Sequence, residues 1–210
     1  MIEEIITIRV IEATLKMKKN TIFRNVNIEA YRGEILGITG KNGVGKTMLL
    51  RCIVGILPLT TGKIFVNGKI LKKEMAFSPN TAYVIEPAGF LSSYNAYDNL
   101  RFLTSLQREV SKIELADVLQ SVGIKPSDKE KVGVFSKGML KRLNIAQIIL
   151  SKPQIILFDD LLDDLDQEGI IYIKKYLRSF ANKGGTAIVT SRYNTAIDDI
   201  CDQIIEMKKE

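Results

Sequence analysis

The spacing of apolar residues along the chain changes from the two-residue period of strands to the longer period of helices. From Thr7 to Ala30, apolar and polar residues alternate on either side of the turn signal Lys19-Asn20, which predicts an antiparallel hairpin or small sheet. The segment Thr61 to Lys69 also has the pattern of a strand, and Asn67-Gly68 predicts a turn that closes it. We therefore expect an N-terminal antiparallel β subdomain.

Helical periodicity dominates residues 88–150. Apolar residues recur there at three- and four-residue spacing over Ala96 to Leu106, Ile113 to Val122 and Met139 to Leu150. The chain, 1–210, is long enough for one domain with a substantial core. We therefore expect a single domain with a helical subdomain inserted at about 88–150.

The C-terminal part of the chain alternates strand and helix patterns. The run from Gln154 to Phe158 is apolar without alternation, as in a strand that is buried on both faces. A helical pattern over Glu168 to Asn182 follows it, and then a strand pattern over Thr186 to Thr190. Short links between strand, helix and strand predict a mostly parallel sheet core, so the expected fold class is α/β.

Composition narrows the class of protein. The 210 residues are 46% hydrophobic, and 30 basic and 24 acidic residues give a net charge of +6. Because the charges are spread along the chain, we interpret them as a solvated surface, and the alternative is that the basic excess favours an anionic membrane face or nucleotides. No nucleic-acid partner is expected. No apolar stretch approaches the ~18 residues of a membrane span, and the first residues lack the basic start of a secretory signal. We expect a soluble, intracellular chain.

Histidine and cysteine usage add two constraints. The sequence has no histidine, which excludes an imidazole base, relay or metal ligand within this chain. Cys52 and Cys201 lie in helix-like contexts without metal-ligand spacing, so we expect both to be buried, reduced thiols.

A glycine-rich loop carries the strongest chemical signal. It stands between an apolar strand-like run, Glu34 to Thr39, and a helix-like run, Met48 to Ile56. Glycines let successive backbone N–H groups turn inward around a phosphate, and the following helix points its positive end at the anion. In such loops a lysine reaches the β- and γ-phosphates and a threonine hydroxyl ligates Mg²⁺. The predicted nucleotide-binding residues are Gly40, Lys41, Asn42, Gly43, Val44, Gly45, Lys46, Thr47 and Met48.

Asp159 is the predicted partner of this loop. It follows the apolar run that ends at Phe158, so it stands at the carboxyl end of a strand, where parallel sheets bind their ligands. From there its carboxylate can reach Mg²⁺ through water beside Thr47. Thr47 and Asp159 are therefore predicted magnesium ligands.

The order of elements resembles that of the ATP-binding cassette (ABC) ATPases over nearly the whole chain, from about Ile5 to Met207. The most specific piece, Phe135 to Leu143, is similar to the family's signature segment. The resemblance implies a P-loop NTPase fold that binds ATP and Mg²⁺ and dimerises head to tail. In such dimers the signature of one domain binds the γ-phosphate held by the other, so contacts from Ser136 and Gly138 are implied.

Two further positions are assigned by the resemblance. Asp166 matches the aspartate of the family's D-loop, so it is expected at the nucleotide site. Glu86 replaces a glutamine that contacts Mg²⁺ and senses the membrane partner in the family. Glutamate at this place resembles the exporters that give self-protection against bacitracin and lantibiotic peptides, so Glu86 is expected to be both a catalytic residue and a metal ligand.

Asp160 and Arg192 are the departures that bear on catalysis. The family's general base is a glutamate, and Asp160 in its place is one methylene shorter, a displacement of about 1.5 Å. The family's switch histidine is Arg192 here, which keeps a positive charge but has no acceptor to orient a water and does not titrate. Both residues are expected to be catalytic, and hydrolysis is expected to be slow.

The segment from Ala88 to Leu100 lies where permeases dock in the family, and it carries Phe90, Tyr94 and Tyr97. An equally good interpretation of each aromatic residue is packing within the helical subdomain.

Together these features predict an ATP-binding and ATP-hydrolysing subunit that energises a separate membrane permease. The resemblance implies a homo- or heterodimer on the inner face of the cell membrane and export of a peptide, antibiotic or small molecule. Two alternatives stay open: a catalytically degenerate module gated by nucleotide, and the degenerate half of a heterodimeric transporter. A cassette acting on DNA or ribosomes is disfavoured, because this chain has no room for the coiled coils or second cassette of those relatives.

Overall fold

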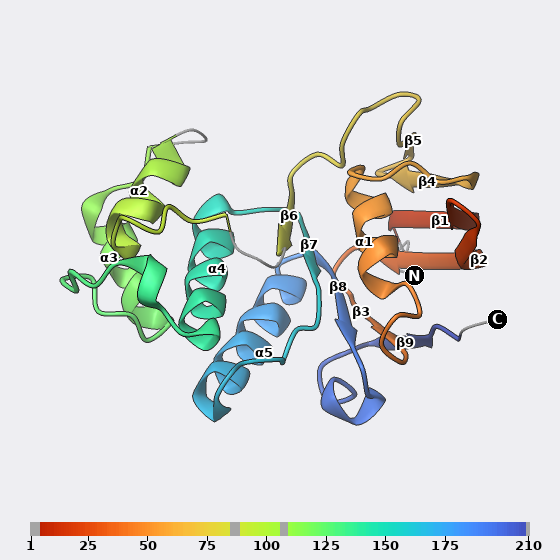
Figure 1. Cartoon of the computed structure of the whole chain (residues 1–210). Coiled ribbons are helices and arrows are strands. Elements are labelled where there is room, and N and C mark those ends of the chain that lie inside the picture. Colours follow the sequence, from red (N-terminus) through yellow and green to blue (C-terminus); the bar gives the residue numbers. More distant parts are fainter. Residues whose placement is uncertain (1–4, 85–88, 106–108, 209–210) are drawn as a thin grey trace. The chain divides into compact units, whose positions relative to one another are not determined.

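The computed structural model describes residues 5–84, 89–105 and 109–208 (Figure 1). The chain divides into two compact units. The first holds residues 1–83, 154–161 and 177–210, and the second holds residues 84–153 and 162–176.

An antiparallel sheet forms the N-terminal part of the first unit. Its strands are β1 (Ile6–Met17), β2 (Asn20–Tyr31), β4 (Thr61–Val66) and β5 (Lys69–Ile70), in the order β2-β1-β4-β5. Antiparallel pairing of β1 with β2 confirms the predicted hairpin. Asn67 and Gly68 both have positive φ between β4 and β5, as a two-residue hairpin turn of this kind requires.

A second sheet supplies the strand ends to which the site residues are attached. It consists of β3 (Ile35–Thr39), β6 (Thr81–Val84), β7 (Ile155–Phe158), β8 (Thr186–Ser191) and β9 (Gln203–Glu206), in the order β6-β7-β8-β3-β9. β3 pairs in parallel with β8 and β9, and β7 pairs in parallel with β8. Every residue of β3, β7 and β8 is buried, which is why these three strands have apolar runs rather than alternation.

Helix α1 (Lys46–Val54) ties the two sheets of this unit together (Figure 1). Leu49, Leu50 and Ile53 are fully buried and belong to a cluster that includes residues of β1, β2 and β4 on one side and of β3, β7 and β8 on the other. The loop between β3 and α1 is therefore held at both ends by the core.

The second unit is mainly helical. It contains α2 (Ala96–Ser105), α3 (Lys112–Ser121), the short helix η1 (Val132–Val134), α4 (Lys137–Ser151) and the start of α5 (Gln167–Asn182). Ser111 caps α3 by accepting a hydrogen bond from the Glu114 N–H at 3.1 Å. A further short helix, η2 (Asn194–Ala196), lies in the first unit.

The structure differs from the sequence prediction in two short strands, β6 and β9, and in the secondary structure around Cys201. Neither strand was expected, and Cys201 lies in a half-buried connection just before β9 rather than in a helix. Cys52 is buried in α1 as predicted, and burial raises the pKa of its thiol to about 11, so it is protonated at neutral pH. None of the helices within the described ranges combines the length and apolarity needed to cross a bilayer.

Candidate functional site

The glycine-rich loop forms a cradle between β3 and α1. Gly40, Gly43 and Gly45 have φ values of 145°, 78° and 109°, a region that residues with a Cβ rarely adopt. A Cβ on Gly43 would meet no atom within 4 Å, so the loop faces open space there. Gly45 occupies the N-cap position of α1 and has no side chain with which to cap the helix. The first N–H groups of α1 are thereby available to an anion.

Lys46 turns back along this loop. Its side chain is buried, with 6% exposure, and its ammonium donates a 2.7 Å hydrogen bond to the Gly40 carbonyl oxygen. A buried ammonium next to a neutral carbonyl is costly without a counter-charge, so this arrangement favours an anionic ligand in the loop. The loop therefore fits a polyphosphate.

Two carboxylates stand at the end of β7. The Thr190 hydroxyl, on the neighbouring strand β8, donates to Asp159 Oδ1 at 2.8 Å and accepts from the Asp160 N–H at 2.8 Å. Asp160 has a φ of 42°, in the left-handed region that aspartate and asparagine tolerate better than most residues. Thr190 thus holds the Asp159 carboxylate and the Asp160 backbone N–H, a role that the sequence analysis did not assign. The sequence offered one sign of this role, because Thr190 places a hydroxyl at the end of the strand predicted over Thr186 to Thr190.

Tyr83, the last residue of the first unit before the boundary, lies close enough to Asp159 to feel its charge. Burial first, and then the charge of Asp159, raise the pKa of Tyr83 to about 12, with Arg51 opposing them. The phenol is therefore neutral at physiological pH, and the negative charge beside it belongs to Asp159. Carboxylate and hydroxyl oxygens are the ligands that Mg²⁺ prefers, so Asp159 and Thr47 suit that ion.

Arg192 contacts the loop directly. It follows β8, and its Nε donates a 3.1 Å hydrogen bond to Asn42 Oδ1, although the two residues are 150 positions apart. Both side chains are exposed, so the contact can be exchanged for a ligand. Among the predicted residues of the first unit, the structure therefore brings Asn42 and Arg192 together. Glu86, the remaining predicted catalytic residue, lies outside the described residues.

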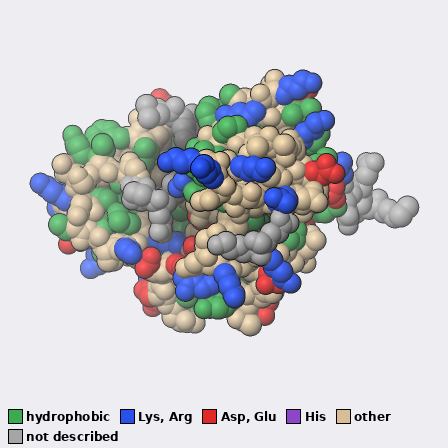
Figure 2. All heavy atoms as spheres, turned by 45° about the vertical axis from the view of Figure 1, so that its right-hand side comes forward, with side chains coloured by type: hydrophobic (Ala, Val, Ile, Leu, Met, Phe, Trp, Pro, Cys, Tyr) green, Lys and Arg blue, Asp and Glu red, His purple; other side chains and the backbone are tan. Residues whose placement is uncertain are grey.

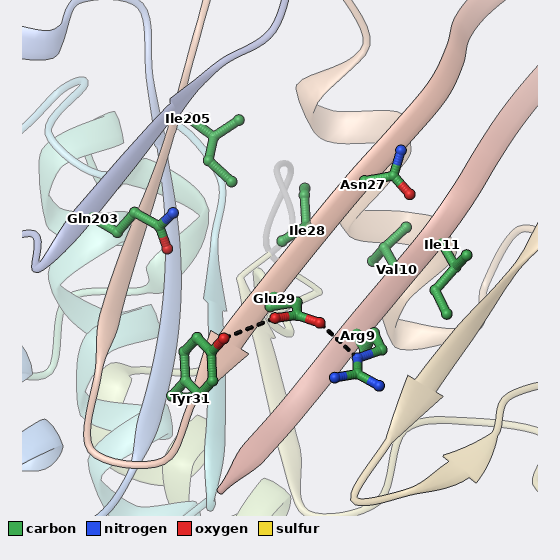
Figure 3. Close-up of a pocket in the computed structure, with 9 residues that line it drawn as sticks. All are labelled: Arg9, Val10, Ile11, Asn27, Ile28, Glu29, Tyr31, Gln203 and Ile205. Carbon is green, nitrogen blue, oxygen red and sulfur yellow. Dashed lines mark hydrogen bonds and ion pairs between the residues drawn. The ribbon is translucent and has the colours of Figure 1, made fainter. Parts of the chain in front are cut away.

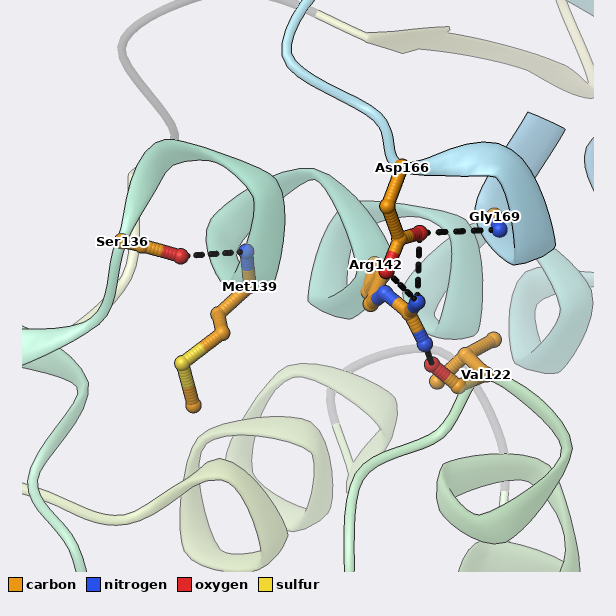
Figure 4. Close-up of polar contacts among 6 residues, drawn as sticks. All are labelled: Val122, Ser136, Met139, Arg142, Asp166 and Gly169. Carbon is orange, nitrogen blue, oxygen red and sulfur yellow. Dashed lines mark hydrogen bonds and ion pairs between the residues drawn. The ribbon is translucent and has the colours of Figure 1, made fainter.

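The signature segment lies in the second unit, and Figure 4 shows its polar contacts. Ser136 is the N-cap of α4 and accepts from the Met139 N–H at 3.2 Å. A Cβ on Gly138 would lie 2.7 Å from the Asp164 carbonyl oxygen, so this glycine permits close packing against the segment Asp163–Asp166. Asp166, the predicted D-loop aspartate, belongs to the same unit and is bound by Arg142.

A separate cavity of about 530 Å³ lies over the antiparallel sheet and β9 (Figure 3). Three of its polar side chains contact one another: Glu29 accepts from the Tyr31 hydroxyl at 2.7 Å and forms an ion pair with Arg9 at 2.7 Å. None of the predicted nucleotide-binding residues lines it. This cavity is therefore distinct from the phosphate loop.

On the face of the molecule that Figure 2 draws, basic side chains are not gathered in one place. Figure 2 shows Lys and Arg in several small groups on the visible face, with Asp and Glu between them. This distribution agrees with the interpretation of the net charge as a solvated surface.

Removing the Thr190 hydroxyl tests the clamp at the strand ends. Because Thr190 is fully buried, Thr190→Val leaves the Asp160 N–H without its acceptor, and we expect the free energy of unfolding to fall by about 1–3 kcal/mol. ATP turnover should fall with it, because the Asp159 carboxylate and the Asp160 backbone lose the hydroxyl that holds them both. Thr190→Ser keeps the hydroxyl and should retain most of both properties in chemical denaturation and phosphate-release assays. A valine variant as stable and active as wild type would contradict this role.

Comparisons with known proteins point to one family. A family model described as "ABC transporter" matches residues 23–162. The uncharacterized ABC transporter ATP-binding protein YybJ of Bacillus subtilis (strain 168) is 36% identical over 200 residues, which are 95% of this chain and 92% of that protein. The bacitracin transport ATP-binding protein BcrA of Enterococcus faecalis is 29% identical, over 91% of this chain but only 63% of its own length. This chain therefore spans less than two thirds of that relative.

Solved structures show the same fold. A structure described as the ATP-binding subunit of an ABC transporter superposes with a TM-score of 0.84 at 21% identity, over 96% of this chain and 85% of that chain. A putative ABC transporter ATP-binding protein from Pyrococcus furiosus gives a TM-score of 0.81 at 24% identity, over 95% and 96% of the two chains.

Proposed function

The chain belongs to the ABC transporter family and is an ATP-binding ATPase subunit. From this premise we propose that it energises a separate membrane permease. We also propose that this transport is the export of peptides or small molecules. The phosphate loop carries the proposal: a buried Lys46 beside Gly40, and Arg192 on Asn42, form a site for the triphosphate of ATP. The proposed position is on the inner face of the cell membrane, as part of a dimer of ATP-binding domains.

The residues of the first unit take the following roles in this proposal. Lys46 and the N–H groups at the start of α1 neutralise the phosphate charge. Thr47 and Asp159 are the residues that would hold Mg²⁺, which supplies further charge neutralisation at the phosphoryl oxygens when bound. Asp160 accepts the proton of the attacking water, and Thr190 holds the backbone of Asp160 by accepting a hydrogen bond from its N–H.

Hydrolysis is proposed to be slow, and the reason is positioning rather than charge. Asp160 reaches about 1.5 Å less far than the glutamate of the family, and its left-handed backbone adds a constraint on where the carboxylate can go. Arg192 supplies a positive charge to the γ-phosphate but cannot accept a hydrogen bond from a water. Charge neutralisation is thus complete while the water is poorly oriented, which favours ATP binding over cleavage.

The second nucleotide contact is proposed to come from another copy or a paralogous chain. Ser136 and Gly138 stand at the N-terminus of α4, where N–H groups and the helix dipole attract an anion. Ser136 already caps the helix at 3.2 Å, so its hydroxyl has a defined position from which to meet a γ-phosphate. If the partner is a different chain, the site built from this chain's loop is the degenerate one.

An exposed apolar surface on the second unit is the proposed docking site for the permease. Leu91 and Tyr94 are 51% and 45% exposed, and the Tyr94 ring packs edge-on against Phe102 at 5.2 Å between centroids. Leu91 and Tyr94 belong to the predicted docking segment, Ala88 to Leu100, and Phe102 follows it. The first residue of that segment, Ala88, lies outside the described residues. Exposed aromatic side chains held by a neighbour are typical of protein-binding surfaces.

Export is supported by similarity to the bacitracin transport and lantibiotic transport ATP-binding proteins, which are 29% and 28% identical to this chain. Cells that lack this chain are expected to be more sensitive to a peptide antibiotic such as bacitracin. Wild-type chain should restore tolerance, whereas Lys46→Ala should not, because export depends on ATP. Inhibitory concentrations measure the effect, with Lys63→Ala as the control for loss of an exposed lysine. Equal tolerance with wild type and Lys46→Ala would contradict ATP-driven export.

A further inference from the structure

Arg142 joins three segments of the second unit through one guanidinium (Figure 4). Its Nη2 donates to both carboxylate oxygens of Asp166, each at 2.6 Å. Its Nη1 donates to the carbonyl oxygen of Val122, the C-cap residue of α3, at 3.0 Å. Arg142 therefore connects the first turns of α4 with the end of α3 and with the segment that precedes α5.

The arginine side of this pair is enclosed and the aspartate side is exposed. The Arg142 side chain is 18% exposed and that of Asp166 is 63% exposed. Asp166 Oδ1 also accepts from the Gly169 N–H at 3.0 Å, so the same carboxylate caps α5. The hydrogen bonds from Arg142 and then from Gly169 hold the pKa of Asp166 below its usual value, and the carboxylate is ionised at neutral pH.

The backbone makes room for this arrangement at two glycines. A Cβ on Gly123, whose φ is 74°, would overlap the Arg142 guanidinium. A Cβ on Gly138 would lie 2.7 Å from the Asp164 carbonyl oxygen. The signature segment and the segment Asp163–Asp166 thus meet twice, through close backbone packing and through the ion pair.

We infer that Arg142 is a positioning residue that couples the signature segment to the segment Asp163–Asp166. It fixes the two segments relative to each other, so that both contact the partner's nucleotide in a geometry that exists before the nucleotide binds. The inference rests on the proposed function, because it assigns a task to two segments that face another chain's ATP. An exposed ion pair is a weak source of stability in general, but three hydrogen bonds from one planar group fix direction as well as distance. Loss of Arg142 is therefore expected to affect geometry more than folding.

Amide hydrogen exchange of the nucleotide-free full-length chain tests the coupling directly. In Arg142→Ala, exchange should rise together in residues 137–141 and 163–170, because both segments lose the same partner. Turnover at saturating Mg-ATP should fall on the order of tenfold, while KM for ATP changes little because the phosphate loop lies in the other unit. Arg142→Lys can keep the charge contact with Asp166 but lacks the planar guanidinium that donates to Asp166 and to the Val122 carbonyl oxygen at once. It should therefore recover turnover only in part.

Arg178 offers a matched control elsewhere in the chain. It donates to Asp202 Oδ1 at 2.9 Å and to the Ile200 carbonyl oxygen, the same combination of one carboxylate and one backbone oxygen. Asp202 in turn accepts from the Ile35 N–H at 2.8 Å, as Asp166 does from Gly169. Arg178→Ala should leave exchange in residues 137–141 and 163–170 and turnover per folded molecule at wild-type values.

The outcomes separate this inference from the proposed function. Wild-type exchange in either segment of Arg142→Ala, or a turnover loss no greater than that of Arg178→Ala, would overturn the role of Arg142. A wild-type chain without turnover would overturn the proposed function alone, because the exchange experiment needs no nucleotide. Joint loosening of both segments in that case still supports the coupling.

Discussion

Replacing Lys46 with alanine is expected to remove ATP turnover and to weaken ATP binding about tenfold to a hundredfold. Lys46 is the buried cation of the phosphate loop, and a hydrogen bond to a charged group contributes about 1.5–3 kcal/mol. The charge that develops on the phosphoryl oxygens in the transition state needs the same ammonium, so turnover should fall by at least about 10². Binding of a fluorescent ATP analogue and phosphate release measure the two effects.

The fold should survive this substitution. Lys46→Ala removes a buried charge whose partner in the structure is a neutral carbonyl oxygen, so the nucleotide-free variant should melt at the wild-type temperature or above it. Lys63→Ala, at an exposed position on β4 in the same unit, is the control for a change of net charge. Undiminished ATP binding by Lys46→Ala would show that the loop does not hold the phosphates.

Substitution of Asp160 with asparagine is expected to reduce ATP hydrolysis without changing ATP binding. Asp160→Asn keeps the size of the side chain and tolerates the positive φ equally well, so the hydrogen bond from its N–H to Thr190 should persist. Asparagine cannot accept the proton of the water, and turnover should fall by a factor of about 10² or more with ATP affinity unchanged. Equilibrium binding and phosphate release on the same preparation separate the two effects. Turnover that persists in Asp160→Asn would remove Asp160 from the mechanism.

Asp160→Glu should act in the opposite direction. The added methylene moves the carboxylate outward by about 1.5 Å, toward the distance at which the family's glutamate acts, so turnover should rise. Glutamate tolerates the left-handed backbone less well, and the variant should be about 1 kcal/mol less stable. Adding Arg192→His restores an acceptor near the γ-phosphate and should raise turnover further. A decrease in turnover in both variants would show that the length of the side chain at position 160 does not limit hydrolysis, and that the placement of its backbone does.

The sequence predicted the elements whose pattern is set by burial. The run before Asp159 is buried on both faces and lacks alternation, and it is strand β7 as expected. Strand β9 was missed because it is four residues long, lies at the edge of its sheet and mixes exposed with half-buried positions. Strand β6 is equally short and at the other edge. Patterns of that length do not distinguish a strand from a connection.

The place of the glycine-rich loop between β3 and α1 could be predicted because its pattern is local in sequence. The contacts that orient the rest of the site join distant positions: Thr190 and Asp159 are 31 residues apart, and Arg142 and Asp166 are 24 apart. Spacing alone does not reveal such pairs, because they depend on which strand ends and helix ends the fold brings together. Thr190 and Arg142 therefore emerged only from the structure.

The most direct test of the central claim is phosphate release by the purified wild-type chain with Mg-ATP, measured over a range of protein concentrations. We expect release that requires Mg²⁺, is absent in Lys46→Ala, and has a specific activity that rises with protein concentration because a second copy completes the site. Specific activity indistinguishable from that of Lys46→Ala at every concentration would contradict the account of this chain as an ATPase that completes its own site.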